Sequence, residues 1–279
     1  MISVSGSKKA MAVFIENFYV FNFFKLKIQR RIILKKMSVY QLLFEKDLGK
    51  WTEEFKKYKS AIKDISDRID KCVEKYGDYY PDKRDLFRAF ELTPLEKIKV
   101  VIVGQDPYPS ILENGKCRAQ GLSFSVSKED SIPGSLRNIY KEIKNDFPMF
   151  KEPSHGDLTY WAEQGVFLFN QALTYCPKEP KCYLNLWNRF TNIVIKIING
   201  NIDNCIYVLW GKKAEKLAEF IKSREIITGV HPSPMSANRG FFNKHYFLKI
   251  NITLKRQNKD QINFNEDKKL LPTFVENLK

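Results

Sequence analysis

Four polar side chains each follow a short apolar run of the chain, and their types could act together on a planar ring. The runs span residues 99–103, 166–169, 206–210 and 225–230. The residues that follow them are, in the same order, Asp106, Asn170, Lys212 and His231. An amide can read the hydrogen-bonding edge of a base, while a carboxylate and an imidazole can assist the cleavage of a bond. Each residue alone is typical of a turn or a cap, so the joint pattern carries the inference.

The elements that must position these side chains can be read from the same runs. All four are rich in Val, Ile and Leu without strict alternation, which is typical of strands buried on both faces. Helical stretches separate them, and this alternation implies right-handed crossovers. We therefore expect an α/β fold, a three-layer sandwich whose central four-stranded parallel sheet is flanked by helices on both faces. Ligands bind beyond the carboxyl ends of such strands, so the four polar residues should meet at one edge.

The expected helices rest on apolar spacing and on capping residues. Ile62, Ile65, Ile69 and Val73 recur at helical spacing. Ser135 is expected to cap one helix, and Asp157 to cap another that ends at Gly165. Two further helices are expected over residues 187–198 and 212–221.

Charge and cysteine content limit the class of partner and of site. The 279 residues hold 47 Lys and Arg against 32 Asp and Glu, a net charge of +15. This excess favours a polyanionic partner, with nucleic acid ahead of an acidic membrane surface. Five Cys without a C-x-x-C pair, and only three His, argue against a disulfide framework, a zinc site and an iron–sulfur site. We expect no metal and no cofactor, and an intracellular, reducing location.

The first 44 residues differ from the rest of the chain. Residues 1–40 hold eight Lys and Arg against one acid, around an apolar, Phe-rich stretch at 10–24. That stretch is too short and too interrupted to span a membrane, so no stable membrane insertion is expected. An organelle-targeting segment, a helix that binds a membrane surface or a partner, and a poorly ordered leader remain open, as does translation from Met37. We assign 1–44 to a leader of unknown role and 45–279 to a single domain.

The motifs at the strand ends resemble those of the uracil-DNA glycosylases, in the branch that lacks metal ions and iron–sulfur clusters. The similarity covers about residues 51–264, most of the chain outside the leader. The matching motifs are GQDPY at 104–108, QGLSFSV at 120–126, HGDL at 155–158, LFN at 168–170, LWG at 209–211, HPSP at 231–234 and RGFF at 239–242. Any one of these is weak alone, but their order on one scaffold makes chance matching very improbable.

This resemblance implies an enzyme that flips uracil out of DNA, hydrolyses its N-glycosidic bond and leaves an abasic site for base excision repair. It implies catalytic roles for Asp106 and His231. The residues implied to bind uracil are Gln105, Tyr108, Phe124 and Asn170. Those implied to bind DNA are Ser135, Lys212, Ser233, Met235, Ser236 and Arg239. The expected partner is single- and double-stranded DNA that contains uracil, bound by a monomer in the nucleus or cytoplasm, with mitochondrial targeting by residues 1–40 an option.

Some positions depart from the family pattern. Pro109 stands where most members have a His, Gly134 replaces a Pro, Lys212 replaces a small residue and Met235 replaces a Leu. Pro109 and the basic leader motivate an alternative, a DNA-binding replication or repair accessory protein with the same fold and reduced activity. A nucleotide-binding module is a weaker option, because no G-x-G-x-x-G or G-K-[ST] loop occurs.

Overall fold

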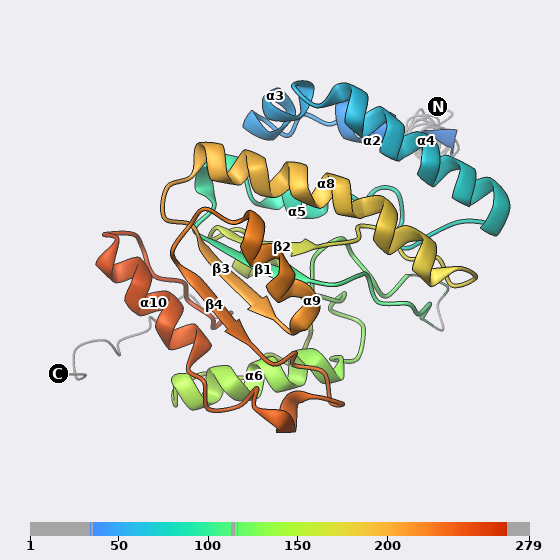
Figure 1. The fold of residues 1–279 in the computed structure, drawn as a ribbon. Coiled ribbons are helices and arrows are strands. Elements are labelled where there is room, and N and C mark those ends of the chain that lie inside the picture. The colour runs from blue at the N-terminus through green and yellow to red at the C-terminus, as the bar shows by residue number, and fades with distance from the viewer. Residues whose placement is uncertain (1–33, 35, 113–114, 116, 267–279) are drawn as a thin grey trace, which may run out of the picture.

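A parallel β-sheet forms the centre of the molecule in the computed structural model, which describes residues 34, 36–112, 115 and 117–266 (Figure 1). Its strands are β1 (Val100–Gly104), β2 (Val166–Asn170), β3 (Ile206–Trp210) and β4 (Ile226–Gly229). They pair in the order β2-β1-β3-β4, all parallel. The four strands expected from the sequence are thereby confirmed.

Burial distinguishes the first three strands from the fourth. Every residue of β1, β2 and β3 is buried, as their continuous apolar sequences predict. In contrast, β4 pairs only with β3 and is half-buried with one exposed residue, so the expectation of burial on both faces is wrong for it. The edge position alone is not the reason, because the other edge strand, β2, is fully buried, with helical residues 88–92 and 159–162 packed against it.

Helices surround this sheet. Helix α8 (Pro180–Asn201) lies on one side of it, and α6 (Gly134–Asp146) lies on the opposite side (Figure 1). Helix α10 (Tyr246–Arg256) packs against α6. Short elements complete the region: α5 (Arg88–Leu92), η1 (Leu95–Lys97), α7 (Thr159–Ala162), α9 (Lys212–Glu215), η2 (Lys216–Phe220) and η3 (Ala237–Arg239).

Helix boundaries differ from the expected ones because neighbouring turns decide them. The cap of α6 is Pro133, and Ser135 lies inside the first turn without a capping hydrogen bond, so the predicted cap is wrong. Asp157 precedes the cap of α7, although its Oδ1 accepts the amide hydrogen of Thr159 at 2.9 Å. Helix α7 ends at Ala162, before the expected Gly165.

Two further helices were predicted with the wrong length. Helix α8 extends beyond the expected 187–198 in both directions, with a proline in its first turn where no amide hydrogen is needed. The stretch expected as one helix over 212–221 is a single α-helical turn, α9, followed by the 3₁₀-helix η2.

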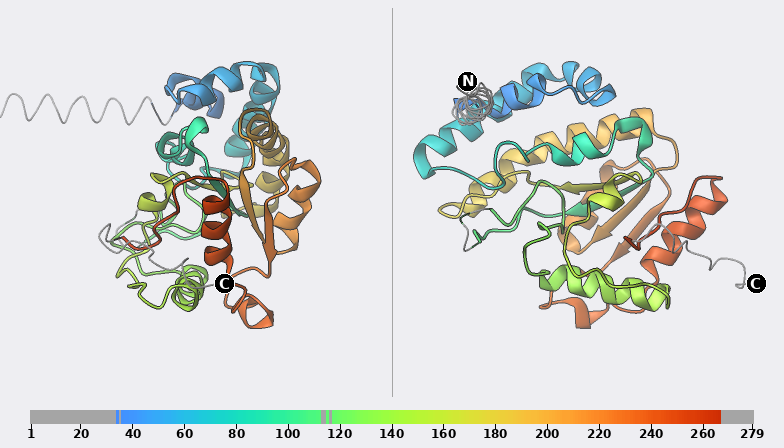
Figure 2. Two further views of the ribbon diagram at one scale, coloured as in Figure 1. Left: turned by 90° about the vertical axis from the view of Figure 1, so that its left-hand side faces the viewer. Right: turned by 180° about the vertical axis from the view of Figure 1, so that it is seen from behind.

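The N-terminal helices add a layer outside α8. They are α2 (Val39–Glu45), α3 (Lys50–Lys56) and α4 (Lys59–Tyr76), and α4 packs on α8 (Figures 1 and 2). The predicted helical spacing in α4 is confirmed, with Ile62, Ile65 and Ile69 buried. Val39 and Leu42 of α2 are buried against the same core. The packed region therefore includes residues 39–43, which we assigned to the leader. Residues 1–33 lie outside the described residues.

The strand order places a crevice at the carboxyl ends of β1 and β3. The chain leaves β1 toward β2 on one side, and leaves β3 toward β4 on the other. Loops that depart in opposite directions open a space between them, and this is where open α/β sheets bind ligands. No helix within the described residues is long and apolar enough to cross a membrane.

Candidate active site

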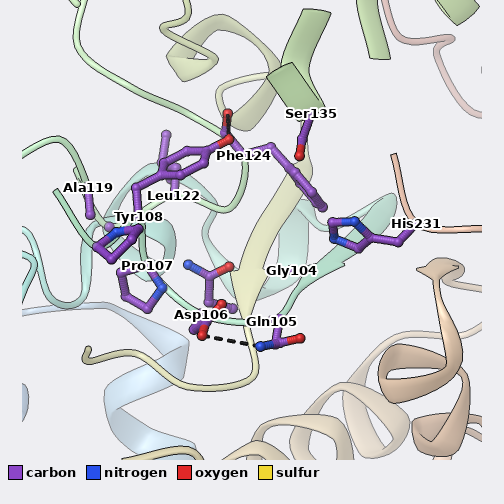
Figure 3. A pocket seen from close by; sticks show the side chains of 13 residues that line it. Gly104, Gln105, Asp106, Pro107, Tyr108, Ala119, Leu122, Phe124, Ser135 and His231 are labelled. Carbon is purple, nitrogen blue, oxygen red and sulfur yellow. Dashed lines mark hydrogen bonds between the residues drawn. The ribbon is translucent and has the colours of Figure 1, made fainter. Parts of the chain in front are cut away.

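A cavity of about 120 Å³ lies at this crevice and holds most of the residues that the motifs predicted (Figure 3). It is lined by Gly104, Gln105, Asp106, Pro107, Tyr108, Pro109, Ala119, Gly121, Leu122, Phe124, Ser135, Asn170 and His231. Both catalytic candidates and all four uracil-binding candidates are in this set. They come from the loops after β1 and β4, from the last residue of β2 and from the segment between β1 and α6.

Asp106 is a partly buried carboxylate at the floor of the cavity. Its Oδ2 accepts a hydrogen bond from Gln105 Nε2 at 3.2 Å (Figure 3). Burial raises the pKa of Asp106, while the Gln105 hydrogen bond and the positive charge of Lys213 oppose that rise. The result is an anion with few partners, aimed into a confined space, which suits a group that must stabilise a nearby positive charge.

His231 lies on another wall, and its environment fixes which nitrogen carries the proton. Its Nδ1 accepts the backbone amide hydrogen of Ser233 at 3.1 Å. Burial lowers the pKa of His231, so the neutral imidazole is favoured. A neutral ring that accepts at Nδ1 carries its hydrogen on Nε2. His231 can therefore donate one hydrogen bond from Nε2 while remaining uncharged.

Aromatic rings form the apolar part of the cavity. Phe124 packs against the His231 ring with centroids 5.9 Å apart, and against Trp210 at 5.7 Å. Its φ of 62° places it in the left-handed region, which costs a bulky residue roughly 1–2 kcal/mol. The Tyr108 hydroxyl donates to the Phe124 carbonyl at 3.3 Å, and burial raises the pKa of that hydroxyl. This bond ties the Tyr108 side chain to the backbone of Phe124, and both residues line the cavity (Figure 3).

Asn170 reaches the cavity only because residue 104 is glycine. The two residues are paired across β1 and β2, and Asn170 is 8% exposed. A Cβ built on Gly104 would overlap Asn170 Oδ1 and lie 2.7 Å from Ser123 Cβ. Backbone hydrogen bonds also tie the two strand ends, from Gln171 to the Gly104 carbonyl at 3.0 Å. Sequence reasoning missed this role of Gly104, because a close approach between two strand ends leaves no local pattern.

Among the predicted DNA-binding residues only Ser135 lines the cavity, and the others follow β3 and β4 in the chain. Ser233 and Ser236 share a hydrogen bond of 2.7 Å between hydroxyls, and Ser236 also donates to the His231 carbonyl. Met235 is 88% exposed, and Arg239 donates to its carbonyl at 2.9 Å.

Three contacts hold the 231–240 loop in place. A Cβ on Gly134 would lie 2.5 Å from Pro234 Cγ, so glycine lets this loop approach the start of α6. Asn138 of α6 donates to the Pro232 carbonyl at 2.8 Å. On the other side, a Cβ on Gly211 would lie 3.0 Å from His231 Cβ, which places exposed Lys212 beside the loop. The departure at position 134 thus has a steric reason in this chain.

Buried acids of α6 anchor the segment that follows this loop, a feature that sequence reasoning also missed. Glu142 accepts the amide hydrogens of Asn243, Lys244 and His245 at 2.7–2.9 Å.

Within the described residues, no group of three or more His, Cys, Asp or Glu could hold a metal ion.

Comparison with known proteins identifies the family. A family model described as the uracil DNA glycosylase superfamily matches residues 90–255. The chain belongs to this superfamily. It is 42% identical over 213 residues to the uracil-DNA glycosylase of Aliivibrio fischeri, a match that covers 75% of this chain and 92% of that protein. It is 48% identical over 184 residues to the enzyme of Buchnera aphidicola, covering 64% and 81% of the two chains.

A solved structure shares the fold. The mimivirus uracil-DNA glycosylase superposes with a TM-score of 0.74 at 34% identity, over 81% of this chain and 89% of that one. The expected family, fold class and activity are confirmed: this uracil-DNA glycosylase family member is a DNA-repair glycosylase that excises uracil. The alternative of an accessory protein is not favoured.

Proposed function

We propose that Asp106 and His231 carry out the excision from opposite sides of a uracil held in the cavity. The observation that carries this assignment is that one confined space contains both groups together with Phe124 and Asn170. Uracil must leave the base stack to reach such a space, because the glycosidic bond is shielded in the duplex.

The reaction divides charge between the two groups. As the bond from the sugar to uracil stretches, the sugar takes on oxocarbenium character and the base becomes an anion. The Asp106 carboxylate stabilises the cation and orients the attacking water. The water gives its hydroxyl to the sugar of the abasic site, and its other proton passes to the carboxylate and from there to solvent. His231 donates from Nε2 to uracil O2, where negative charge develops. A neutral donor suits this role, because the proton stays on the imidazole while the anion leaves.

Recognition of uracil depends on the hydrogen-bonding edge of the base and on the space beside its 5-position. The Asn170 amide accepts from uracil N3–H and donates to O4, whereas cytosine presents the opposite pattern at this edge. A mispaired and buried polar edge costs about 1–3 kcal/mol. Tyr108 occupies the space beside the 5-position and excludes the thymine methyl. Phe124 stacks on the base, and Gln105 contributes a backbone contact.

The residues predicted to bind DNA contact its backbone and the site of the flipped base. Short Ser135, Ser233 and Ser236 side chains let phosphates approach the backbone closely, and Lys212 adds a positive charge. Met235 projects into solvent, where an apolar side chain can fill the space that the flipped base leaves. Arg239 adds a phosphate or minor-groove contact. We propose that the protein acts as a monomer on single- and double-stranded DNA, without a metal ion or cofactor.

A single-turnover assay tests the assignment. The substrate is an oligonucleotide with one uracil, in EDTA, and abasic sites are measured as alkali-labile breaks. Asp106→Asn should lower the excision rate by about 10²–10⁴-fold, because its charge is needed chiefly in the transition state. DNA affinity should change little. Asp203→Asn, at an exposed carboxylate, is the matched control and should retain full activity. Equal losses of rate and affinity in Asp106→Asn would contradict its role.

His231→Gln gives the second arm of the test. Glutamine keeps a hydrogen-bond donor but changes its position, so the excision rate should fall by about 10–10³-fold. A parent-like rate in this variant would show that the imidazole makes no contact with the developing anion.

A further inference from the structure

An ion pair outside the cavity closes the loop that carries Phe124. Arg118 Nε lies 2.7 Å from Asp130 Oδ2, and Arg118 Nη2 donates to Asp130 Oδ1 at 2.8 Å. Arg118 Nη2 also donates to Ser131 Oγ at 2.8 Å. The Asp130 side chain is 3% exposed, and that of Arg118 is 24% exposed. This ion pair, with one hydrogen bond and one close charge contact to a buried carboxylate, fixes geometry more firmly than a surface ion pair does.

Arg118 and Asp130 flank the segment 119–129 and hold its two ends together, and we call this place its neck. Just inside the neck, Ala119 and Val126 form an antiparallel bridge. The Arg118 amide donates to the Ser110 carbonyl at 3.1 Å, which connects the neck to the loop that carries Tyr108. On its other side, Asp130 shortly precedes Pro133, the cap of α6, where Ser135 lies. The ion pair thus joins three segments that line the cavity.

The segment it closes holds a strained residue. Phe124 has a φ of 62°, and such a conformation persists only where the surroundings over-determine it. Inside the loop, Gln120 supplies part of this constraint, because its Nε2 donates to the Val126 carbonyl at 2.8 Å. Gln120 Oε1 in turn accepts from Arg88 Nη1 at 2.9 Å. These bonds hold the interior of the loop, whereas Arg118 and Asp130 hold its open end.

We propose that Arg118 and Asp130 are a positioning pair for uracil excision, which holds the rings of Phe124 and Tyr108 at the distance that the base requires. This inference rests on the proposed roles of those two rings. Loosening the neck lets the Phe124 carbonyl move away from the Tyr108 hydroxyl that it accepts from, so both walls of the cavity shift together. Neither charged residue lines the cavity, and the two charges offset one another near Tyr108, since Arg118 lowers the pKa of Tyr108 and Asp130 raises it.

The test compares the excision rate with the affinity for DNA in Arg118→Gln. The rate should fall about tenfold or more, because misplacement by an ångström can cost about 10²-fold. The dissociation constant for DNA, and its dependence on salt, should stay within about threefold of the parent. Arg84→Gln is the matched control: Arg84 binds Asp82 through Nε at 3.1 Å and Nη2 at 3.2 Å, but both side chains are largely exposed. Its rate should stay within about twofold.

Two further variants separate positioning from loss of folding. Arg118→Lys keeps the charge without the planar fork, and should recover part of the rate. Arg118→Gln with Asp130→Asn removes the uncompensated buried charge and should raise the thermal midpoint above that of Arg118→Gln. The excision rate should stay low, because the charged hydrogen bond across the open end of the loop is lost. Should Arg118→Gln be unfolded at the assay temperature, Arg118→Lys and the double variant carry the comparison.

Three results would overturn the proposal. One is an unchanged rate in folded Arg118→Gln. Another is a higher dissociation constant of Arg118→Gln for DNA, with a shallower salt dependence and a parent-like excision rate, which would make Arg118 a phosphate contact. The last is a loss of excision rate in Arg84→Gln as large as that in Arg118→Gln. Failure of the proposed function is distinct from all three: Phe124→Ala or Asp106→Asn would then leave the excision rate unchanged as well.

Discussion

Replacement of Gly104 by alanine is the sharpest test of how the fold positions the base-reading amide. Gly104 ends β1 opposite Asn170, and it has no unusual backbone requirement, since its φ lies outside the positive region. Any effect of a methyl group must therefore come from the space that it occupies. That space is filled by Asn170 Oδ1 and by Ser123 Cβ.

The expected magnitude follows from these two contacts. The new Cβ would lie 2.7 Å from Ser123 Cβ, whereas carbon atoms pack at about 3.5–4.0 Å, so a shift of roughly 0.8 Å or more is needed. Asn170 Oδ1 is overlapped and must also move, which is cheap in stability because it ends a side chain that can rotate. We expect the free energy of unfolding to fall by about 1–3 kcal/mol. A displacement of this size at a substrate contact should lower the excision rate by about 10²-fold.

Single-turnover excision from a uracil-containing single strand measures the rate, and thermal unfolding measures the stability. Gly200→Ala is the matched control, because Gly200 lies in α8 with no atom within 4 Å of a built Cβ. It should stabilise the protein by about 0.5–1 kcal/mol and leave the rate unchanged. A Gly104→Ala variant with a parent-like rate would refute the argument that this glycine sets the position of Asn170.

The remaining predictions concern specificity, the DNA wedge, pH and salt. Tyr108→Ala should release thymine from a T-containing oligonucleotide, while Tyr108→Phe keeps the ring and should not; an unchanged thymine background in Tyr108→Ala would argue against exclusion by shape. Met235→Ala should lower excision from duplex DNA more than from single strands, with the thermal midpoint unchanged because the side chain is 88% exposed; equal losses on both substrates would contradict a wedge. Burial raises the pKa of Asp106 and lowers that of His231, so kcat/KM should fall on the acid side, where the carboxylate and the imidazole protonate, and stay level from neutral to mildly alkaline pH; a decline above neutral pH would mean that a protonated group is required. DNA affinity should decrease steeply with salt, since the net charge is +15, and a flat titration would argue against phosphate contacts.

The sheet and the residues at its edge could be predicted because their signals are local. Each buried strand is a continuous apolar run bounded by turn residues, and parallel strands bring their carboxyl ends to one edge. Asp106, Asn170 and His231 follow such runs and line one cavity. The roles of Tyr108 and Phe124 came from the family resemblance, since an aromatic in a turn or an alternating segment is commonly part of the core.

Helix ends and the N-terminal boundary were less predictable because packing overrides weak local preferences. Ser135 is a good capping residue, yet Pro133 caps α6. Helix α2 looked like part of a basic leader, but its buried Val39 and Leu42 show that tertiary contacts draw it onto α4. A capping preference of about 1 kcal/mol is easily outweighed by several buried side chains.

The amino-acid sequence is enough to identify the catalytic and base-reading side chains and the edge of the sheet that they occupy, because apolar runs and turn residues alternate along the chain. How close those groups come depends on the tertiary structure. It placed Asn170 over Gly104, fixed the Nε2 hydrogen of His231 through the Ser233 amide, and closed the Phe124 loop with Arg118 and Asp130. These contacts join residues brought together by the fold, and their distances depend on packing that no local pattern encodes.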